Sequence, residues 1–173
     1  GGYARRTLAL ADNFIHLARA ESSAMSWEIL NLADIATEAV DDIWPQAQRA
    51  GTAIDLNVPA EELLVRGDRA LLARALGNLL DNALKYGERA HLHIEDDAEA
   101  FVLHVDDEGP GVPEQKLEQV FEPHFRLASQ QQGYGMGLGI ARNLAHSHGG
   151  ELSLRNLRDG GLRVTLWLPR QSR

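Results

Sequence analysis

The sequence contains no cysteine, which excludes disulfide bonds and thiolate metal sites. It also lacks any apolar run near the roughly 20 residues that cross a bilayer, and it does not open on a charged-then-apolar secretory leader. Basic residues are few and unclustered at a net charge of −8, so nucleic acid is not expected as a partner. What is present, 44% hydrophobic and 24% charged residues over 173 positions, is ordinary for one globular domain with a short appendage.

Hydrophobic spacing predicts an α+β fold. Helices are expected over residues 3–22, 34–50, 69–86, 113–120 and 138–148, and strands over 27–31, 52–58, 63–66, 91–95, 101–106, 151–157 and 162–168. The order of these elements predicts a two-layer α/β sandwich, with a mixed sheet covered by helices on one face and an N-terminal helix before it. Between residues 107 and 139 the chain is rich in Gly and Pro, and a loop of this length is usually functional or mobile.

The predicted N-terminal helix has an unusually broad apolar face. Leu8, Phe14, Ile15 and Leu17 belong to two neighbouring stripes, wider than one packing partner covers. This breadth favours one helix of a bundle over a helix packed only on its own domain.

The stretch LGNLLDNALKYG, residues 76–87, places poor helix formers inside a helix. Asn78, Asn82, Lys85 and Tyr86 share one stripe beside the apolar face. The stripe is either a solvated polar face or a ligand site, and two observations favour the ligand: one of only two lysines in an arginine-rich chain lies here, and Asn oxygens suit Mg²⁺ while Lys suits phosphate. Gly77 is interpreted as a position of close packing against the sheet or a neighbouring helix.

Two glycine-containing segments follow. In VDDEGPGV, residues 105–112, Asp107 extends a core-facing row, so it is either a turn residue or an acceptor for a ligand amino group such as that of adenine. Gly109 and Gly111 leave room there for a flat ring. In GYGMGLG, residues 133–139, alternating glycines lead into a helix and can offer backbone N–H groups to phosphate.

Taken in order, these segments resemble the ATP-binding domain of sensor histidine kinases, within the GHKL ATPase superfamily. GNLLDNALKYG resembles the N box of that family, DEGPG its G1 box, VFEPHFR its F box and GMGLG its G2 box, and HGGEL before the last hairpin also matches. The resemblance covers residues 30–169. LARAES, residues 17–22, is similar to the second helix of the dimerisation and phosphoacceptor bundle, which implies an incomplete bundle over residues 1–26 and a catalytic domain over residues 27–173.

The resemblance implies ATP and Mg²⁺ as ligands. Asn82 is then the Mg²⁺ ligand, Asn78 supports the phosphates or the ion, Lys85 contacts phosphate, and Asp107 receives the adenine amino group. The catalytic set is Asn82, Lys85 and Arg126. The implied ATP-binding residues are Asn78, Asn82, Lys85, Tyr86, Asp107, Gly109, Gly111, Val112, Arg126, Gly135, Gly137, Leu138 and Gly139.

Residues 122–134 are implied to form the ATP lid, in which His124 replaces the usual second aromatic of the F box. The implied reaction is transfer of the ATP γ-phosphoryl group to a histidine on a bundle helix absent from this chain. Gyrase-like relatives carry a Glu, as base for attacking water, where this chain has Asn78. The alternatives are a degenerate nucleotide-binding module and a protein-serine kinase of the anti-sigma type.

The implied partners are the phosphoacceptor bundle, a second protomer and the receiver domain of a response regulator. The implied location is the cytoplasmic portion of an inner-membrane sensor kinase.

The remaining histidines are interpreted as structural or solvent-exposed. His91 and His93 lie on one side of a predicted strand, a spacing that can bind a metal. A third ligand would be needed, His104 on the next strand, and the pattern leaves open whether it faces them.

Overall fold

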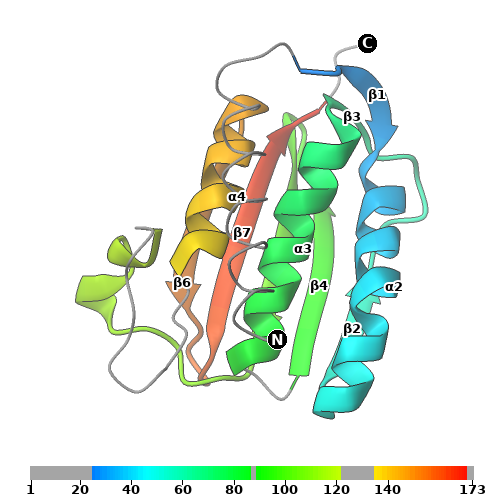
Figure 1. Cartoon of the computed structure of the whole chain (residues 1–173). Helices are drawn as coiled ribbons and strands as arrows, with labels where there is room; N and C mark the ends of the chain where they lie inside the picture. Colours follow the sequence, from blue (N-terminus) through cyan, green and yellow to red (C-terminus); the bar gives the residue numbers. More distant parts are fainter. Residues whose placement is uncertain (1–24, 87–88, 122–134, 171–173) are drawn as a thin grey trace, which may run out of the picture.

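A computed structural model describes residues 25–86, 89–121 and 135–170. The described chain forms two layers, a five-stranded sheet and three α-helices that cover one of its faces (Figure 1). The strands are β1 (Glu28–Asn31), β2 (Ala53–Asn57), β3 (Leu64–Gly67), β4 (Arg89–Asp96), β5 (Ala100–Asp107), β6 (Glu151–Asn156) and β7 (Leu162–Pro169). The helices are α2 (Leu32–Ala50), α3 (Arg69–Tyr86) and α4 (Gly135–Ser147), with two 3₁₀ turns, η1 (Glu114–Lys116) and η2 (Gln119–Phe121).

The large sheet is mixed, as predicted. Its strand order is β2-β4-β5-β7-β6, with β2 parallel to β4 and every other neighbouring pair antiparallel. Strands β1 and β3 form a separate antiparallel pair. Because β2 runs parallel to β4, the chain must cross over between them, and the crossover contains α3.

The core lies between the sheet and the helices. Alternate residues of β4 and β5 point into it, and Leu92 and Leu103 are fully buried there against leucines of α3 such as Leu79. The predicted row on β5 is confirmed, because Phe101, Leu103, Val105 and Asp107 are all buried. The intervening residues of both strands form the opposite face of the sheet, which no described helix covers.

The helix ends follow local chemistry. Asp68 caps α3, because its Oδ1 accepts the Leu71 backbone N–H at 3.2 Å. Asn31 caps α2 in the same way, through Ala33 N at 3.1 Å. Gly51 ends α2 with a φ of 70°, the left-handed conformation that favours glycine.

Three expectations about individual segments need correction. Residues 113–120 do not form an α-helix, because η1 and η2 are i to i+3 turns, for example Lys116 N to Pro113 O at 2.8 Å. So short a segment gains little as an isolated helix, and its conformation follows its packing instead. Helix α4 begins at Gly135, three residues before the predicted start. Gly77 is not a close-packing position, since a Cβ there would meet no described atom within 4 Å.

The predicted N-terminal helix, residues 3–22, lies outside the described residues. Among the helices that the structure describes, none has the length and apolar character that crossing a membrane requires.

Candidate nucleotide-binding site

The second half of α3 presents the predicted polar stripe. Asn82 is buried, and its Nδ2 has no hydrogen-bond partner among the described residues. Lys85 is exposed one turn later and pairs with Asp81 at 3.2 Å. A buried amide nitrogen without an acceptor costs about 1–3 kcal/mol, so an incoming oxygen atom would relieve it. A phosphate oxygen suits that nitrogen, and the oxygen of the same amide is of the kind that binds Mg²⁺.

The first turn of α4 faces this stripe. Asn78 Nδ2 donates a hydrogen bond to the Gly137 carbonyl oxygen at 3.2 Å, although the two residues are 59 positions apart. Gly135, Gly137 and Leu138 lie in the first helical turn, where backbone N–H groups lack helical acceptors and the helix dipole favours anions. The Leu138 side chain is fully buried in the core, so only its backbone could contact a phosphate.

Gly139 serves a different purpose from the other glycines of α4. A Cβ at Gly139 would lie 2.3 Å from the Phe121 carbonyl oxygen, whereas one at Gly137 would meet no described atom within 4 Å. Gly139 therefore lets α4 approach the backbone of η2, and Gly137 leaves space beside the first turn of α4.

Asp107 closes the site at the end of β5. Only 3% of the residue is exposed, and its Oδ1 accepts hydrogen bonds from Gly109 N at 2.8 Å and Leu162 N at 3.3 Å. No described residue donates to its second oxygen, Oδ2. Burial raises the pKa of the Asp107 carboxyl, which the two backbone donors only partly offset. A carboxylate in this condition suits a ligand that brings its own N–H donor.

The end of α3, the start of α4 and the end of β5 lie at the same end of the domain (Figure 1). The structure therefore brings together residues from three of the sequence segments singled out above. Asn78 and Gly137 are in direct contact, Asn82 lies one turn further along α3, and Asp107 follows β5.

This sequence matches the family described as histidine kinase-, DNA gyrase B-, and HSP90-like ATPase over residues 67–172. The chain belongs to this ATPase family. Sensor histidine kinase GtrS of Pseudomonas aeruginosa is 71% identical over 104 residues, covering 60% of this chain and 22% of GtrS. Sensor protein CutS of Streptomyces coelicolor is 31% identical over 173 residues, covering 95% of this chain and 41% of CutS.

The solved structures agree with this assignment. The catalytic domain of histidine kinase ThkA superposes with a TM-score of 0.76 at 25% identity, covering 86% of this chain and 100% of that one. The expected α+β architecture is thus confirmed, and this ATPase domain is the ATP-binding catalytic domain of the sensor histidine kinase type. The chain spans less than half the length of GtrS and CutS.

Several predicted site residues lie outside the residues that the structure describes. Arg126, His124 and the whole implied lid belong to residues 122–134, which the structure does not describe. Tyr86 ends α3, but nothing is described of its side chain.

Asn156 is a residue of the ATPase domain that the sequence analysis missed. Its Oδ1 accepts the Val112 N–H at 2.9 Å, and its Nδ2 donates to the Val112 carbonyl oxygen. Gly111, with a φ of 77°, lets this side chain approach, because a Cβ there would lie 2.6 Å from Asn156 Oδ1. Asn156 therefore fixes the loop that the sequence predicts to line the adenine. A polar residue at the end of a strand gives no signal of such a role.

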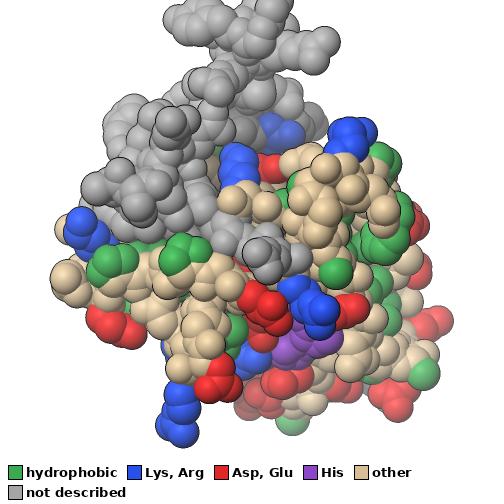
Figure 2. Space-filling view, turned by 90° about the horizontal axis from the view of Figure 1, so that it is seen from below, with side chains coloured by type: hydrophobic (Ala, Val, Ile, Leu, Met, Phe, Trp, Pro, Cys, Tyr) green, Lys and Arg blue, Asp and Glu red, His purple; other side chains and the backbone are tan. Residues whose placement is uncertain are grey.

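A hollow of about 1050 Å³ opens next to this loop but is not the predicted nucleotide site. It is lined by Asp107 and Asn156 and also by Arg89, His91 and Arg163, which lie on the face of the sheet away from the helices. Figure 2, which looks onto this end of the domain, shows basic, acidic and histidine side chains side by side. Within this hollow, Arg163 pairs with Asp106 through two hydrogen bonds of 2.7 and 2.8 Å. Asn78, Asn82 and Gly137 do not line this hollow, because they lie on the helical side, where the polar groups of α3 and α4 converge.

Proposed function

We propose that this ATPase domain binds ATP with Mg²⁺ between α3, α4 and the end of β5. We further propose that it transfers the γ-phosphoryl group to a histidine on a helix bundle. The observation that carries the proposal is the contact between Asn78 Nδ2 and Gly137 O at 3.2 Å, beside the unpartnered amide nitrogen of Asn82. It joins a stripe of amide and ammonium groups to a helix N-terminus, which is the combination that a triphosphate with a cation requires.

The proposed roles follow from the chemistry of each group. Asp107 Oδ2 accepts the adenine amino group, while Gly109 and Gly111 leave room for the ring. The first-turn N–H groups of Gly135, Gly137 and Leu138 receive phosphate oxygens, and Gly139 allows the approach of η2 described above. Val112, held by Asn156, lines the base.

Asn82 is the proposed Mg²⁺ ligand, and the ion when bound would neutralise charge on the phosphates. Asn78 holds the first turn of α4 in place and supports the phosphate end. Lys85 exchanges its exposed pair with Asp81 for a phosphate oxygen, which costs little because exposed ion pairs contribute about 0–1 kcal/mol. Tyr86 is proposed to pack near the nucleotide and Arg126 to reach the γ-phosphate. Asn78 offers no carboxylate to activate water, which favours transfer to a protein acceptor over rapid hydrolysis.

The proposal extends to the rest of the protein. Residues 1–26 are proposed to be the second helix of a dimerisation bundle and residues 27–173 the catalytic domain. The acceptor histidine, the second protomer and the response regulator lie outside this chain. The location proposed is the cytoplasmic side of an inner membrane.

Nucleotide binding is tested by calorimetric titration of the chain with a magnesium complex of a non-hydrolysable ATP analogue. Asp107→Asn replaces a charged acceptor by an amide, and hydrogen bonds to charged groups contribute about 1.5–3 kcal/mol. We therefore expect affinity to fall about 10- to 150-fold. Asn82→Ala should weaken binding as well.

The matched control is Asp106→Asn, which changes the neighbouring carboxylate on the opposite face of β5 and should alter affinity less than about twofold. If the wild-type chain binds the analogue no better than Asp107→Asn or Asn82→Ala, the proposed site is wrong.

Phosphoryl transfer is tested on the longer protein that carries the acceptor bundle. Incubation with labelled ATP should give an acid-labile, base-stable phosphoprotein, as expected of phosphohistidine. An acid-stable product would instead indicate a serine kinase, and nucleotide binding without any transfer would indicate a degenerate module.

A further inference from the structure

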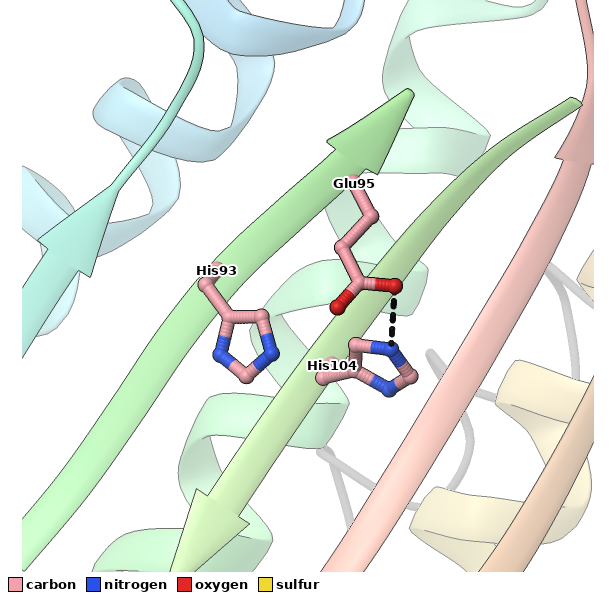
Figure 3. A group of neighbouring side chains, drawn as sticks. All are labelled: His93, Glu95 and His104. Carbon is pink, nitrogen blue, oxygen red and sulfur yellow. Dashed lines mark ion pairs between the residues drawn. The ribbon is translucent and has the colours of Figure 1, made fainter. Parts of the chain in front are cut away.

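A cluster of two histidines and one glutamate lies on the face of the sheet opposite the helices. His93 and Glu95 are alternate residues of β4, and His104 of β5 is the direct cross-strand partner of His93. Figure 3 shows the three side chains turned toward one another above the strands. The sequence left open whether His104 faces His93, and the structure shows that it does.

The distances suit a small metal ion. One ligand atom from each of the three side chains can be chosen so that all lie within 4.8 Å of one another. Glu95 Oε2 and His104 Nε2 are 3.5 Å apart. Two ligands bound to tetrahedral Zn²⁺ at about 2.0–2.2 Å lie about 3.4 Å apart, so this pair already has the required separation. A small movement of the His93 ring would complete the set.

The surroundings hold the ligands in place. His104 Nδ1 contacts Thr165 Oγ1 at 2.9 Å, which leaves its Nε2 directed at Glu95. Metal-binding histidines are typically oriented in this way, through a hydrogen bond from the other ring nitrogen. Only 11% of the His104 side chain is exposed, whereas 64% of Glu95 is, so an ion can enter from the Glu95 side.

The neighbouring histidine does not belong to the set. The His91 and His93 ring centroids lie 5.1 Å apart with the rings tilted by 42°, but His91 Nδ1 faces Asp55 on β2, whose Oδ2 is 3.9 Å away. Asp106, its cross-strand partner, is held by Arg163.

We propose that His93, Glu95 and His104 bind one Zn²⁺ ion, with water in the fourth position. Two imidazoles and a carboxylate favour Zn²⁺ over Mg²⁺, which prefers oxygen ligands. The site lies across the sheet from the proposed nucleotide site and is independent of it. A bound ion would connect β4 to β5 and stabilise the centre of the sheet.

The test is calorimetric titration of the untagged, nucleotide-free chain with zinc chloride in a non-chelating buffer. Cobalt(II) is the spectroscopic probe, because a tetrahedral complex absorbs strongly in the visible range. We expect one ion per chain and a zinc-dependent rise in Tm. Loss of a residue that only orients a metal ligand costs about 10- to 100-fold in affinity, so loss of a ligand itself, in Glu95→Gln or His93→Gln, should weaken binding at least about tenfold.

His91→Gln is the matched control, on the same strand and face, and should leave the affinity within about twofold. Asn82→Ala, in the proposed nucleotide site, should also leave it unchanged. Glu95 is exposed, so its variant tests the ligand set without threatening the fold. The proposal is overturned if zinc binding is not saturable at one ion. It is equally overturned if Glu95→Gln and His93→Gln bind as wild type does, or if His91→Gln or Asn82→Ala abolishes binding.

Discussion

The substitution Gly139→Ala tests the contact between α4 and η2. The added Cβ would lie 2.3 Å from the Phe121 carbonyl oxygen, about 1 Å closer than carbon and oxygen atoms tolerate, and the obstacle is backbone rather than a flexible side chain. Overpacking of this kind costs about 1–3 kcal/mol. Replacing a glycine inside a helix by alanine raises the unfolding free energy by about 0.8–1.0 kcal/mol. The net change is therefore a loss of about 0–2 kcal/mol of unfolding free energy.

Gly77→Ala is the matched control, because Gly77 also lies inside a helix but its Cβ would meet no described atom within 4 Å. This variant should gain about 0.8–1.0 kcal/mol of unfolding free energy, the full difference between alanine and glycine inside a helix. The two alanine variants should thus differ by about 1–3 kcal/mol, the overpacking term alone. For a domain of this size each kcal/mol shifts Tm by about 2–4 °C, so the difference in Tm should be roughly 2–12 °C.

The assay is reversible urea unfolding of both variants, followed by circular dichroism and supported by thermal melts. Because Phe121 directly precedes residues 122–134, Gly139→Ala should also weaken ATP-analogue binding, and Gly77→Ala should not. If Gly139→Ala is as stable as Gly77→Ala, the close approach of α4 to η2 does not constrain this glycine and the reasoning is refuted.

Three further predictions concern polar side chains. Asn156→Ala removes both hydrogen bonds to Val112, so it should lower the unfolding free energy by about 1–2 kcal/mol, as measured by urea unfolding. It should also weaken binding of the ATP analogue in calorimetry. Unchanged binding would show that the loop around Val112 does not need these hydrogen bonds. Burial lowers the pKa of His148, whose Nε2 accepts the Asp68 N–H at 3.1 Å. The unfolded chain therefore binds more protons than the folded chain, and the unfolding free energy should fall as the pH decreases through about 6.5. Unfolding curves at several pH values should show a smaller pH dependence for His148→Gln than for wild type. Burial raises the pKa of Asp107, so ionisation of this group lowers the unfolding free energy as the pH rises from about 3.8 through the pKa of the folded state. Without nucleotide, Asp107→Asn should therefore be at least as stable as wild type at pH 7. Marked destabilisation of this variant in unfolding curves would contradict the prediction.

Local patterns were sufficient for the main helices and for one row of site residues. The 3.6-residue spacing of leucines predicted α3, and the same spacing placed Asn78 and Asn82 on one stripe. Alternation along β5 predicted that Asp107 points toward the core. These inferences succeeded because a helix or strand determines which side chains share a face within a few residues of the chain.

Contacts between distant residues needed the tertiary structure. Asn156 holds Val112 from 44 positions away, and neither residue carries a local signal of the pairing. Whether His104 faces His93 depends on the register of β4 and β5, which the short turn between Asp97 and Ala100 sets through two hydrogen bonds of 2.9 and 3.2 Å. A slip of one residue would have turned His104 to the other face of the sheet. The sequence by itself thus determined the strands, the long helices and the family of the chain. Packing decided the conformation of residues 113–120, and packing and strand register decided which polar groups meet, because these contacts join residues that no local preference connects.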